Sequence, residues 1–400
     1  MPRNIHSQDD MVYVMQPTRT LMLAIGVWPS RSGKRSIFRR VYNLFLNFSS
    51  NFLLACEIIP GCIYWLLEDS SRMRLQLTPL LLYVFMCAVQ YDVILSRNDN
   101  IRECWKHVEE DWDNAFSMND RNVMFKCAKS AKLLIMICGV LMYSGVIMYR
   151  IILPLSRGEI VIDQNVTIRP LACPVNFLFV DVQTSPFYEI VFVFQSLTGF
   201  LIVSITTSAY GLLAYFVEHA SSQMKILICL MKNLVREQWK KEEEVDRKLA
   251  EVVEHQIRVH SFLQMVQYTM QEICLVEIMV NTLSICLLLY FVVLDWHTNN
   301  FGVIGSYMLN IINITIHIFL FCYTGEQLNE QAEKVATESR ELEWYHLPET
   351  KMRSVVLIMI MSNYPPKISV CKIMELSFKT FGDIIKTSGA YFNMLRNVTE

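Results

Sequence analysis

The sequence predicts an all-α polytopic membrane protein with seven transmembrane helices. Of its 400 residues, 53% are hydrophobic and only 18% are charged, and the mean hydropathy is +0.30. Soluble domains carry about 25% charged residues. Seven stretches supply the roughly 20 mostly apolar residues that a helix needs to cross the hydrocarbon core. Without internal repeats or a separate soluble region, residues 1–400 form one predicted membrane domain.

The first six spans are expected within residues 41–324 and the last at the end of the chain. They are 41–67, 75–95, 133–155, 187–217, 273–294, 301–323 and 372–398. The first contains Glu57 and Pro60, which neighbouring helices must accommodate. Segments 218–272 and 325–353 are rich in Glu, Lys, Gln, Leu and Ala with almost no Gly or Pro, so we expect helices to continue beyond the membrane there.

Lysine and arginine predict the orientation, because cytoplasmic loops hold them in excess. Of the 36 such residues, 28 lie in the N-terminal segment 1–40 and in the loops on the same side of the predicted membrane. The N-terminus is therefore predicted to be cytoplasmic, the region 325–371 also cytoplasmic, and the C-terminus extracellular. Asn165, in the pattern Asn-Val-Thr, then falls in an outer loop, where it is a candidate for glycosylation.

Signatures of other protein classes are missing. The 12 cysteines lie mostly in apolar runs without paired metal spacing, which argues against a disulfide scaffold and a zinc site. The sequence contains no GxSxG, GxGxxG, Walker or HExxH motif. We therefore expect no enzymatic activity, no cofactor, no metal site and no nucleic-acid partner, and membrane lipid as the surroundings.

The predicted last span carries a polar stripe. At 100° per residue, one arc of about 100° collects eight side chains. They are Lys372, Glu375, Lys379, Asp383, Lys386, Ala390, Met394 and Asn397. Charge in a membrane costs several kcal/mol unless it meets water or a partner. The stripe is therefore expected to face water, or alternatively polar surfaces of the other helices of the chain.

The order of residues along this stripe is typical of an ion pore. Four charged positions come first and would form an inner vestibule: Glu375, Lys379, Asp383 and Lys386. Beyond Lys386 the stripe becomes apolar except for Asn397. A ring of apolar side chains can exclude water and ions until it widens. Because one helix cannot enclose a pore, this interpretation requires several subunits around an axis.

The sixth span has a polar stripe of its own. It consists of Ser306, Asn310, Asn313, His317 and Thr324. Hydrogen bonds between membrane helices explain such stripes in most cases. We therefore expect His317 to be a satisfied interior residue rather than a ligand or a proton relay.

Three motifs in the last 80 residues resemble the C-terminal signature of insect odorant receptors. They are FCYTGEQLNEQAEKVA, ELEWYHLP and LIMIMSNYPPKISVCKIMELSFKTFGDIIKTSGAYFNML, in that order. Seven spans and a cytoplasmic N-terminus agree with the family over the whole chain. The chain is similar in length to a ligand-tuned member, whereas the shared co-receptor has a longer loop between spans four and five.

The resemblance implies a subunit of a tetrameric, odorant-gated, non-selective cation channel. Such a subunit assembles with co-receptor subunits in the plasma membrane of a sensory neuron dendrite, and the last helices surround one pore. Aligned on Tyr391 and Phe392, the hydrophobic gate falls on Met394 and Val398 and the polar filter on Asn397. The region before this helix joins the subunits, which makes Trp344 and Tyr345 expected anchor residues.

The resemblance also implies a pocket for small volatile ligands in the outer half of spans two, three, four and six. The candidate residues there are Tyr83, Met86, Tyr143, Ile147, Phe192, Gln195, Gly199, Tyr307 and Asn310. Aromatic and methionine side chains would bind such ligands mainly by apolar contact.

Two other classes stay open. A gustatory-type receptor channel, which works without a co-receptor, shares the topology but is expected to end in a Gln-Phe motif, which this sequence lacks. A secondary transporter would need inverted repeats and helices broken at mid-membrane, and neither is visible.

Overall fold

The computed structural model describes residues 5–29, 37–115, 117–158, 160–163, 166–175, 182–236, 242–296, 301–347, 349–364, 367–370 and 374–399. In the described residues the chain is almost entirely helical, as predicted. The elements in chain order are α1 (Ile5–Ala24), α2 (Ile37–Leu67), α3 (Ser71–Ser96), α4 (Asn98–Asn114), α5 (Met118–Val146), the π-helix η1 (Ile147–Ile152), α6 (Leu153–Arg157), β1 (Ile160–Asp163), β2 (Val166–Ile168), α7 (Phe187–Arg236), α8 (Glu242–Asp295), α9 (Phe301–Arg340), the 3₁₀-helix η3 (Trp344–His346), α10 (Glu349–Asn363), β3 (Ser369–Val370), β4 (Met374–Glu375) and α11 (Phe378–Thr399). The strands form two antiparallel pairs, β1–β2 and β3–β4.

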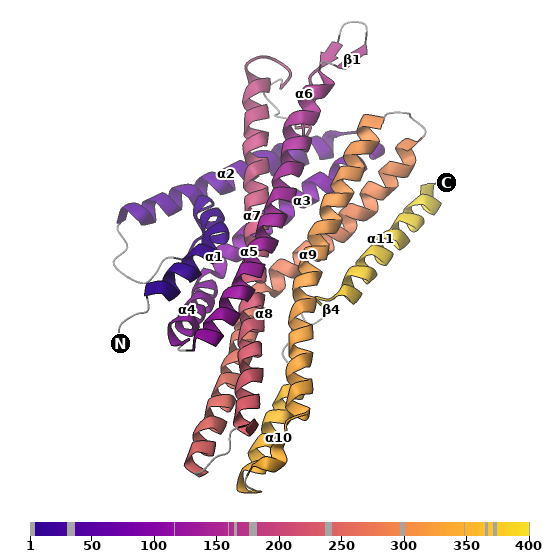
Figure 1. The fold of residues 1–400 in the computed structure, drawn as a ribbon. Helices are drawn as coiled ribbons and strands as arrows, with labels where there is room; N and C mark the ends of the chain where they lie inside the picture. Colours follow the sequence, from indigo (N-terminus) through magenta and orange to yellow (C-terminus); the bar gives the residue numbers. More distant parts are fainter. Residues whose placement is uncertain are drawn as a thin grey trace.

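Six of the described helical segments are long and apolar enough to cross a membrane. They are Val41–Leu67, Ser71–Ser96, Met118–Ser156, Phe187–Val235, Glu243–Asp295 and Gly302–Arg340. Each covers one of the first six predicted spans to within a residue. Helix α11 is not among them, because Lys379, Asp383 and Lys386 interrupt its apolar residues. It lies against α8 and α9 on the flank of the bundle (Figure 1).

The helices α7, α8 and α9 contain 50, 54 and 40 residues. At about 1.5 Å per residue, α8 is roughly 80 Å long, more than twice the thickness of the hydrocarbon core. The four helices α5, α7, α8 and α9 run along the long axis of the molecule, and α10 packs at the end where α7 and α8 are joined (Figure 1). The expectation that helices continue beyond the membrane is confirmed.

The predicted N-terminal segment contains a helix that packs into the bundle. Helix α1 buries Met11, Val14 and Met22 and contacts α5 and α7. Gly211 on α7 permits this approach, because a Cβ there would lie 2.9 Å from the Oγ1 atom of Thr18. Helix α1 is therefore part of the fold rather than a loose tail.

A buried ion pair joins α2 to the π-helix η1. Glu57 and Arg150 have side chains that are 1% and 4% exposed, and their Oε1 and NH1 atoms are 2.7 Å apart. Arg150 also donates a hydrogen bond to the carbonyl oxygen of Gln195 at 3.2 Å. Single π-helical turns are frequent at functional sites. The expectation that a neighbouring helix accommodates Glu57 is confirmed.

A second buried ion pair joins α8 to α9. The Nδ1 atom of His317 lies 2.7 Å from Oε1 of Glu277, and both side chains are 1% exposed. Gln90 on α3 and Asn281 on α8 each donate a hydrogen bond to this carboxylate at 2.5 Å. His317 is therefore an interior residue held by a carboxylate through Nδ1, while its Nε2 atom makes no hydrogen bond within the described residues.

A third cluster, centred on Asp111, joins α4, α7 and α8. The carboxylate lies 2.9 Å from Nε2 of His219 and 3.3 Å from Nδ1 of His107, and Arg258 donates to its other oxygen at 2.5 Å. The ligand atoms of Asp111 and the two histidines lie within 4.8 Å of one another, a spacing that a metal ion can use. Arg258 already neutralises the carboxylate, which favours a structural ion network.

The pKa of Asp111 is held below its ordinary value. Burial alone would raise this pKa, but hydrogen bonds and charge from His107 and His219 lower it. Asp111 is therefore ionised at neutral pH, and its carboxylate stabilises the contact between α4 and the two long helices.

The predicted start of the last helix is wrong. Lys372 lies outside the described residues, and Glu375 belongs to strand β4, which pairs with β3. Helix α11 begins at Phe378, whose N–H donates to Oε2 of Glu326 at 3.0 Å. The Ser377 side chain caps the same end by accepting from the N–H of Thr380. Because these acceptors satisfy the first N–H groups, the helix starts there.

Replacing Asp111 with alanine should destabilise the fold by about 3 kcal/mol, because Arg258 and His219 lose a buried counter-charge. A carboxylate with a lowered folded pKa stabilises above its unfolded pKa, and this stabilisation is lost as pH falls through the folded pKa. The difference in the free energy of unfolding between the wild type and Asp111→Ala should thus become smaller as the pH falls into the acid range. Thermal unfolding of the purified protein at several pH values measures it.

The matched control is Glu110→Ala. Glu110 also contacts Arg258, at 3.3 Å, but its side chain is 46% exposed. Exposed ion pairs contribute about 0 to 1 kcal/mol, so this variant should unfold close to the wild type. Equal losses in both variants would contradict the special role of Asp111.

Removing one partner of the Glu57–Arg150 pair should cost about 3 to 5 kcal/mol, because a charge is left unpaired in the bundle. Arg150→Met should therefore lower the folded, surface-expressed fraction strongly. The double variant Glu57→Leu with Arg150→Met should recover most of that loss, since no lone charge remains. A double variant as unstable as the sum of the single ones would refute the pairing argument.

Candidate functional site

A cavity of about 280 Å³ lies inside the bundle, between α3, α5 with η1, α7, α8 and α9. Residues 170–174, which follow the β1–β2 pair, close part of it. Its volume is near the lower end of the roughly 300–1,000 Å³ that is typical of ligand pockets. It is therefore suited to a small molecule.

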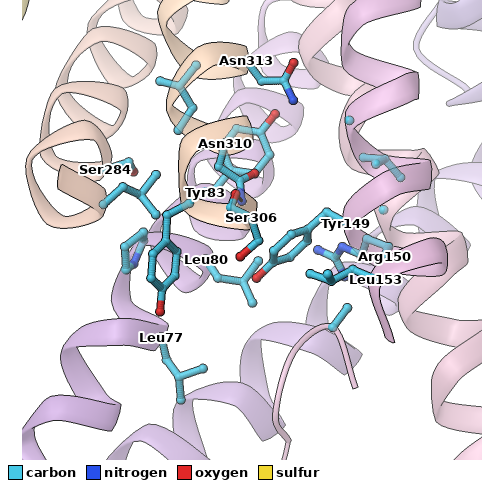
Figure 2. A pocket seen from close by; sticks show the side chains of 18 of the residues that line it. Leu77, Leu80, Tyr83, Tyr149, Arg150, Leu153, Ser284, Ser306, Asn310 and Asn313 are labelled. Carbon is cyan, nitrogen blue, oxygen red and sulfur yellow. Dashed lines mark hydrogen bonds between the residues drawn. The ribbon is translucent and has the colours of Figure 1, made fainter. Parts of the chain in front are cut away.

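One side of the cavity is mainly apolar. It is formed by Leu77, Leu80 and Tyr83 of α3 together with Met142, Val146, Tyr149 and Leu153 of the α5 to α6 segment. Figure 2 shows Leu80, Tyr149 and Leu153 on this side. Such side chains bind an apolar body by contact and dispersion.

The other side comes from α8 and α9 and carries most of the polar groups, beside the apolar Leu288, Val303 and Ile314. It contains Asn281, Ser284, Ser306, Asn310, Asn313 and His317. Ser306, Asn310 and Asn313 project from one side of α9 (Figure 2). The Ser306 hydroxyl and the Asn310 amide bond carbonyl groups of their own helix, Val303 and Ser306. Of the polar stripe on α9, His317 makes a predicted contact to another helix, and Thr324 makes one with Tyr210 at 3.2 Å. The other members of the stripe, Ser306, Asn310 and Asn313, face the cavity.

A polar network holds Tyr307 at the wall of the cavity. Its hydroxyl accepts a hydrogen bond from Gln76 at 2.6 Å and donates to Asp295 at 3.3 Å. Asp295 also pairs with Arg72. Because both functions of the hydroxyl are used, Tyr307 is oriented by the protein and presents its ring to the cavity.

Gly199 permits close contact between α7 and α5. A Cβ at this position would lie 3.1 Å from Cγ1 of Val146 and 3.2 Å from Cδ of Arg150. Contacts this short are rare for real Cβ atoms. A side chain at Gly199 would therefore displace Arg150 and reshape the wall.

Four of the nine residues predicted for a ligand pocket line this cavity, namely Tyr83, Gly199, Tyr307 and Asn310. Three others have separate positions: Met86 is fully buried in the core, Tyr143 bonds Ser204 at 2.7 Å, and Ile147 is 39% exposed. Helical spacing assigns a residue to a face but does not show which faces enclose a space.

The last two predicted residues, Phe192 and Gln195, also lie outside this cavity. Gln195 binds both the N–H and the carbonyl oxygen of Cys173. It borders a second cavity of about 220 Å³, which Glu57 also lines. Arg150 lines the first cavity, so the Glu57–Arg150 pair lies between the two.

The sequence reasoning missed several residues of the cavity wall: Arg150, Asn281, Ser284 and Asn313. Asn313 and His317 were recognised as part of a polar stripe but were assigned to helix packing. The charge of Arg150 inside a predicted span was the available signal, because a membrane helix rarely buries an arginine without a role.

The charged stripe on α11 is not covered by any described residue of the chain. Lys379, Asp383 and Lys386 are exposed, whereas Ile384 and Ser388 on the other side are buried. The Ser388 hydroxyl donates to the carbonyl oxygen of Thr282 on α8 at 3.3 Å. Polar surfaces in the described part of the chain therefore do not cover the charges, and that alternative finds no support there.

The positions predicted for the pore are only partly described. Met394 is 64% exposed, and Asn397 and Val398 belong to the backbone of α11, but their side chains lie outside the described residues. Glu375 pairs with Lys367 at 3.0 Å and is separated from the helix by the turn at Ser377, so it does not continue the stripe as predicted.

Two other predicted features can be placed. Trp344 and Tyr345 lie in η3 and are 43% and 59% exposed, so they are available to a neighbouring molecule. Asn165 lies outside the described residues.

Comparisons with known proteins agree on one family. A family model described as "7tm Odorant receptor" matches residues 75–389. Odorant receptor 13a of Drosophila melanogaster is 25% identical over 228 residues, 53% of each chain. Odorant receptor 10 of Aedes albopictus is 21% identical over 153 residues, 38% of this chain and 40% of its own length. These matches span about half of the relatives' length or less.

The fold has a close structural counterpart. Olfactory receptor OR5 of Machilis hrabei, solved in complex with eugenol, superposes with a TM-score of 0.79 at 18% identity, covering 98% of this chain and 99% of the other. A second structure of the same receptor superposes with a TM-score of 0.77. At this identity the likeness establishes the fold, in which α11 is the seventh transmembrane helix.

The family match over most of the chain and the shared fold confirm a multi-pass membrane receptor rather than an enzyme. The chain belongs to the 7tm odorant receptor family.

Proposed function

We propose that this chain is the ligand-tuned subunit of a heterotetrameric, odorant-gated, non-selective cation channel that contains co-receptor subunits. The observation that carries the proposal is the uncovered charged stripe of α11, on Lys379, Asp383 and Lys386. Charged groups in a membrane need water or a partner. A water-filled axis between several copies of α11 would meet that requirement and would pass cations.

The proposal includes the orientation and the ligand. The N-terminus is cytoplasmic, the C-terminus is extracellular, and the chain lies in the plasma membrane of a sensory neuron dendrite. A small volatile odorant or pheromone occupies the 280 Å³ cavity. Trp344 and Tyr345, exposed in η3, contact neighbouring subunits, and Asn165 carries a glycan.

Helix α8 offers a physical link from the cavity to the pore. Asn281 and Ser284 line the cavity, and the intervening Thr282 accepts a hydrogen bond from Ser388 of α11. Helix α9 makes a second contact, because Phe319 stacks on Phe378 with ring centroids 5.8 Å apart. A ligand that favours one packing of α8 and α9 would thereby move α11, by no more than its difference in affinity between the two states.

The first test is whole-cell current in cells that express this chain with and without an insect co-receptor, during a panel of volatile odorants. The expected result is a non-selective cation current that appears rapidly and only when both subunits are present. Surface labelling of the chain in both conditions is the control.

The same experiment separates the alternatives. An odorant-evoked current from this chain alone would favour a self-sufficient, gustatory-type channel. Uptake of a solute without any evoked current would favour a secondary transporter and would overturn the channel proposal.

The proposed gate consists of Met394 and Val398, and the proposed polar filter beside it is Asn397. Replacing Met394 or Val398 with serine should raise the leak current, because a hydrophobic constriction that takes up water no longer blocks ions. Current without ligand, normalised to surface expression, is the measurement.

The matched control is Ile385→Ser. Ile385 is exposed on the side of α11 opposite the stripe, so the same loss of apolar volume there should leave the leak unchanged. If leak and odorant response of the gate variants both equal those of the wild type at normal surface expression, the gate lies elsewhere.

A further inference from the structure

We propose that the cavity selects a neutral oxygenated ligand, a hydroxyl- or carbonyl-bearing volatile, whose oxygen hydrogen-bonds to Asn313. This inference rests on the proposed function, because it assumes that the cavity is the ligand site. The oxygen would lie on the polar side formed by α8 and α9, and the hydrocarbon part on the apolar side formed by α3 and α5.

Asn313 has the chemistry and the position for this role. Its side chain is half-buried, lines the cavity and projects from α9 beside Asn310 (Figure 2). It makes no hydrogen bond within the described part of the chain, whereas the Asn310 amide bonds the carbonyl oxygen of Ser306 at 3.0 Å. An amide offers two donors and an acceptor, so Asn313 can bind either a carbonyl or a hydroxyl group.

Two further polar groups on the same side are without partners. The Oδ1 atom of Asn281 and the Oγ atom of Ser284 are buried and make no hydrogen bond, and both residues line the cavity. The Asn281 amide nitrogen is committed to Glu277, so its oxygen is left as an acceptor. Buried polar groups without partners are rare in folded proteins. Both oxygens have almost no accessible surface, so they add to the polarity of this side, whereas the half-buried amide of Asn313 is within reach of a ligand.

Gly145 provides the space that Asn313 needs. A Cβ at Gly145 would lie 2.6 Å from Nδ2 and 3.3 Å from Cγ of Asn313, distances that force the amide to move. Gly139 on the same helix is different, because a Cβ there would be 3.8 Å from Thr207, an ordinary contact. Replacing Gly145 with alanine would therefore displace the Asn313 amide without changing its chemistry. Replacing Gly139 with alanine adds the same methyl group to the same helix and leaves Asn313 in place.

The charges around the cavity exclude ionised ligands. Arg150 is paired with Glu57, His317 with Glu277, and Asp295 with Arg72. An ionised acid or amine would lose its hydration in the cavity without finding a free counter-charge. Removing a charged group from water costs far more free energy than removing a neutral polar group. A neutral oxygenated molecule satisfies the polar side at no such cost.

The test is binding of matched compounds to the purified full-length chain in nanodiscs, measured as the ligand-dependent shift of the unfolding midpoint. The probes are hexan-1-ol, hexan-2-one, heptane and hexanoate, together with the aromatic set benzyl alcohol, acetophenone, ethylbenzene and benzoate. We expect an alcohol or ketone to bind about tenfold more tightly than its hydrocarbon, the effect of one net hydrogen bond. The acids should not bind.

Variants assign the effect to Asn313. Asn313→Leu keeps the size of the side chain and should remove the tenfold preference while leaving hydrocarbon binding unchanged or tighter. Gly145→Ala should reduce the preference by displacing the amide, and Gly139→Ala should keep it. If Asn313→Leu does not fold, Gly145→Ala alone tests the inference.

The outcomes are distinguishable. If no compound of either set binds the folded wild type, the assignment of the cavity as the ligand site fails and the inference fails with it, whereas the channel proposal rests on the stripe of α11 and is decided by the current measurement. If hydrocarbons and oxygenated compounds bind equally, if acids bind best, or if Asn313→Leu weakens all compounds alike, the proposed function stands and the inference about Asn313 is wrong.

Discussion

The structure depends on one constraint, that charge inside a membrane must have a partner or water. The two buried pairs, Glu57 with Arg150 and Glu277 with His317, satisfy it within the chain. Arg150, Glu277's helix α8 and His317 belong to the wall of the first cavity, and α2 with Glu57 borders the second, so the same contacts that neutralise charge fix the positions of α2, η1, α8 and α9. Breaking such a pair costs several kcal/mol, which makes the cavity wall rigid where these pairs lie.

Close helix contacts then give the cavity its shape. Gly145 brings α5 against Asn313 at a distance that real Cβ atoms essentially never show, and Gly199 brings α7 against Val146 and Arg150 at a distance that is rare for a Cβ. The π-helical turn places Arg150 between the two cavities. These local features leave one wall rich in polar groups and one mainly apolar wall, and under the proposed function this asymmetry would supply the physical basis for ligand selection.

The spans and their lengths could be predicted from the sequence, because long apolar runs and helix-forming linkers are local properties. The partner of Glu57 could not, since Arg150 is distant in sequence and meets it only after folding. Lys379, Asp383 and Lys386 lie on one exposed face of α11 as the periodicity predicts. The prediction was wrong at Glu375, because capping by Glu326 and Ser377 starts α11 later than periodicity suggests. The resemblance to the receptor family placed Tyr83, Gly199, Tyr307 and Asn310 in the outer halves of the pocket-forming spans, and they line the cavity, whereas Asn281 and Ser284 of the fifth span required the packing itself.

Under the proposed function, the charges of α11 would favour assembly by the same constraint. Surrounded by lipid, a single copy of the chain would leave Lys379, Asp383 and Lys386 exposed to hydrocarbon, at about 2.5–3.5 kcal/mol for each charge near the centre of the membrane. No other helix in the described part of the chain covers them, and their alternating signs offset only a fraction of this cost. Several copies of α11 around water remove the penalty from every subunit at once. Assembly and a conducting axis would then have one physical cause, and the apolar end of the helix would decide when ions pass.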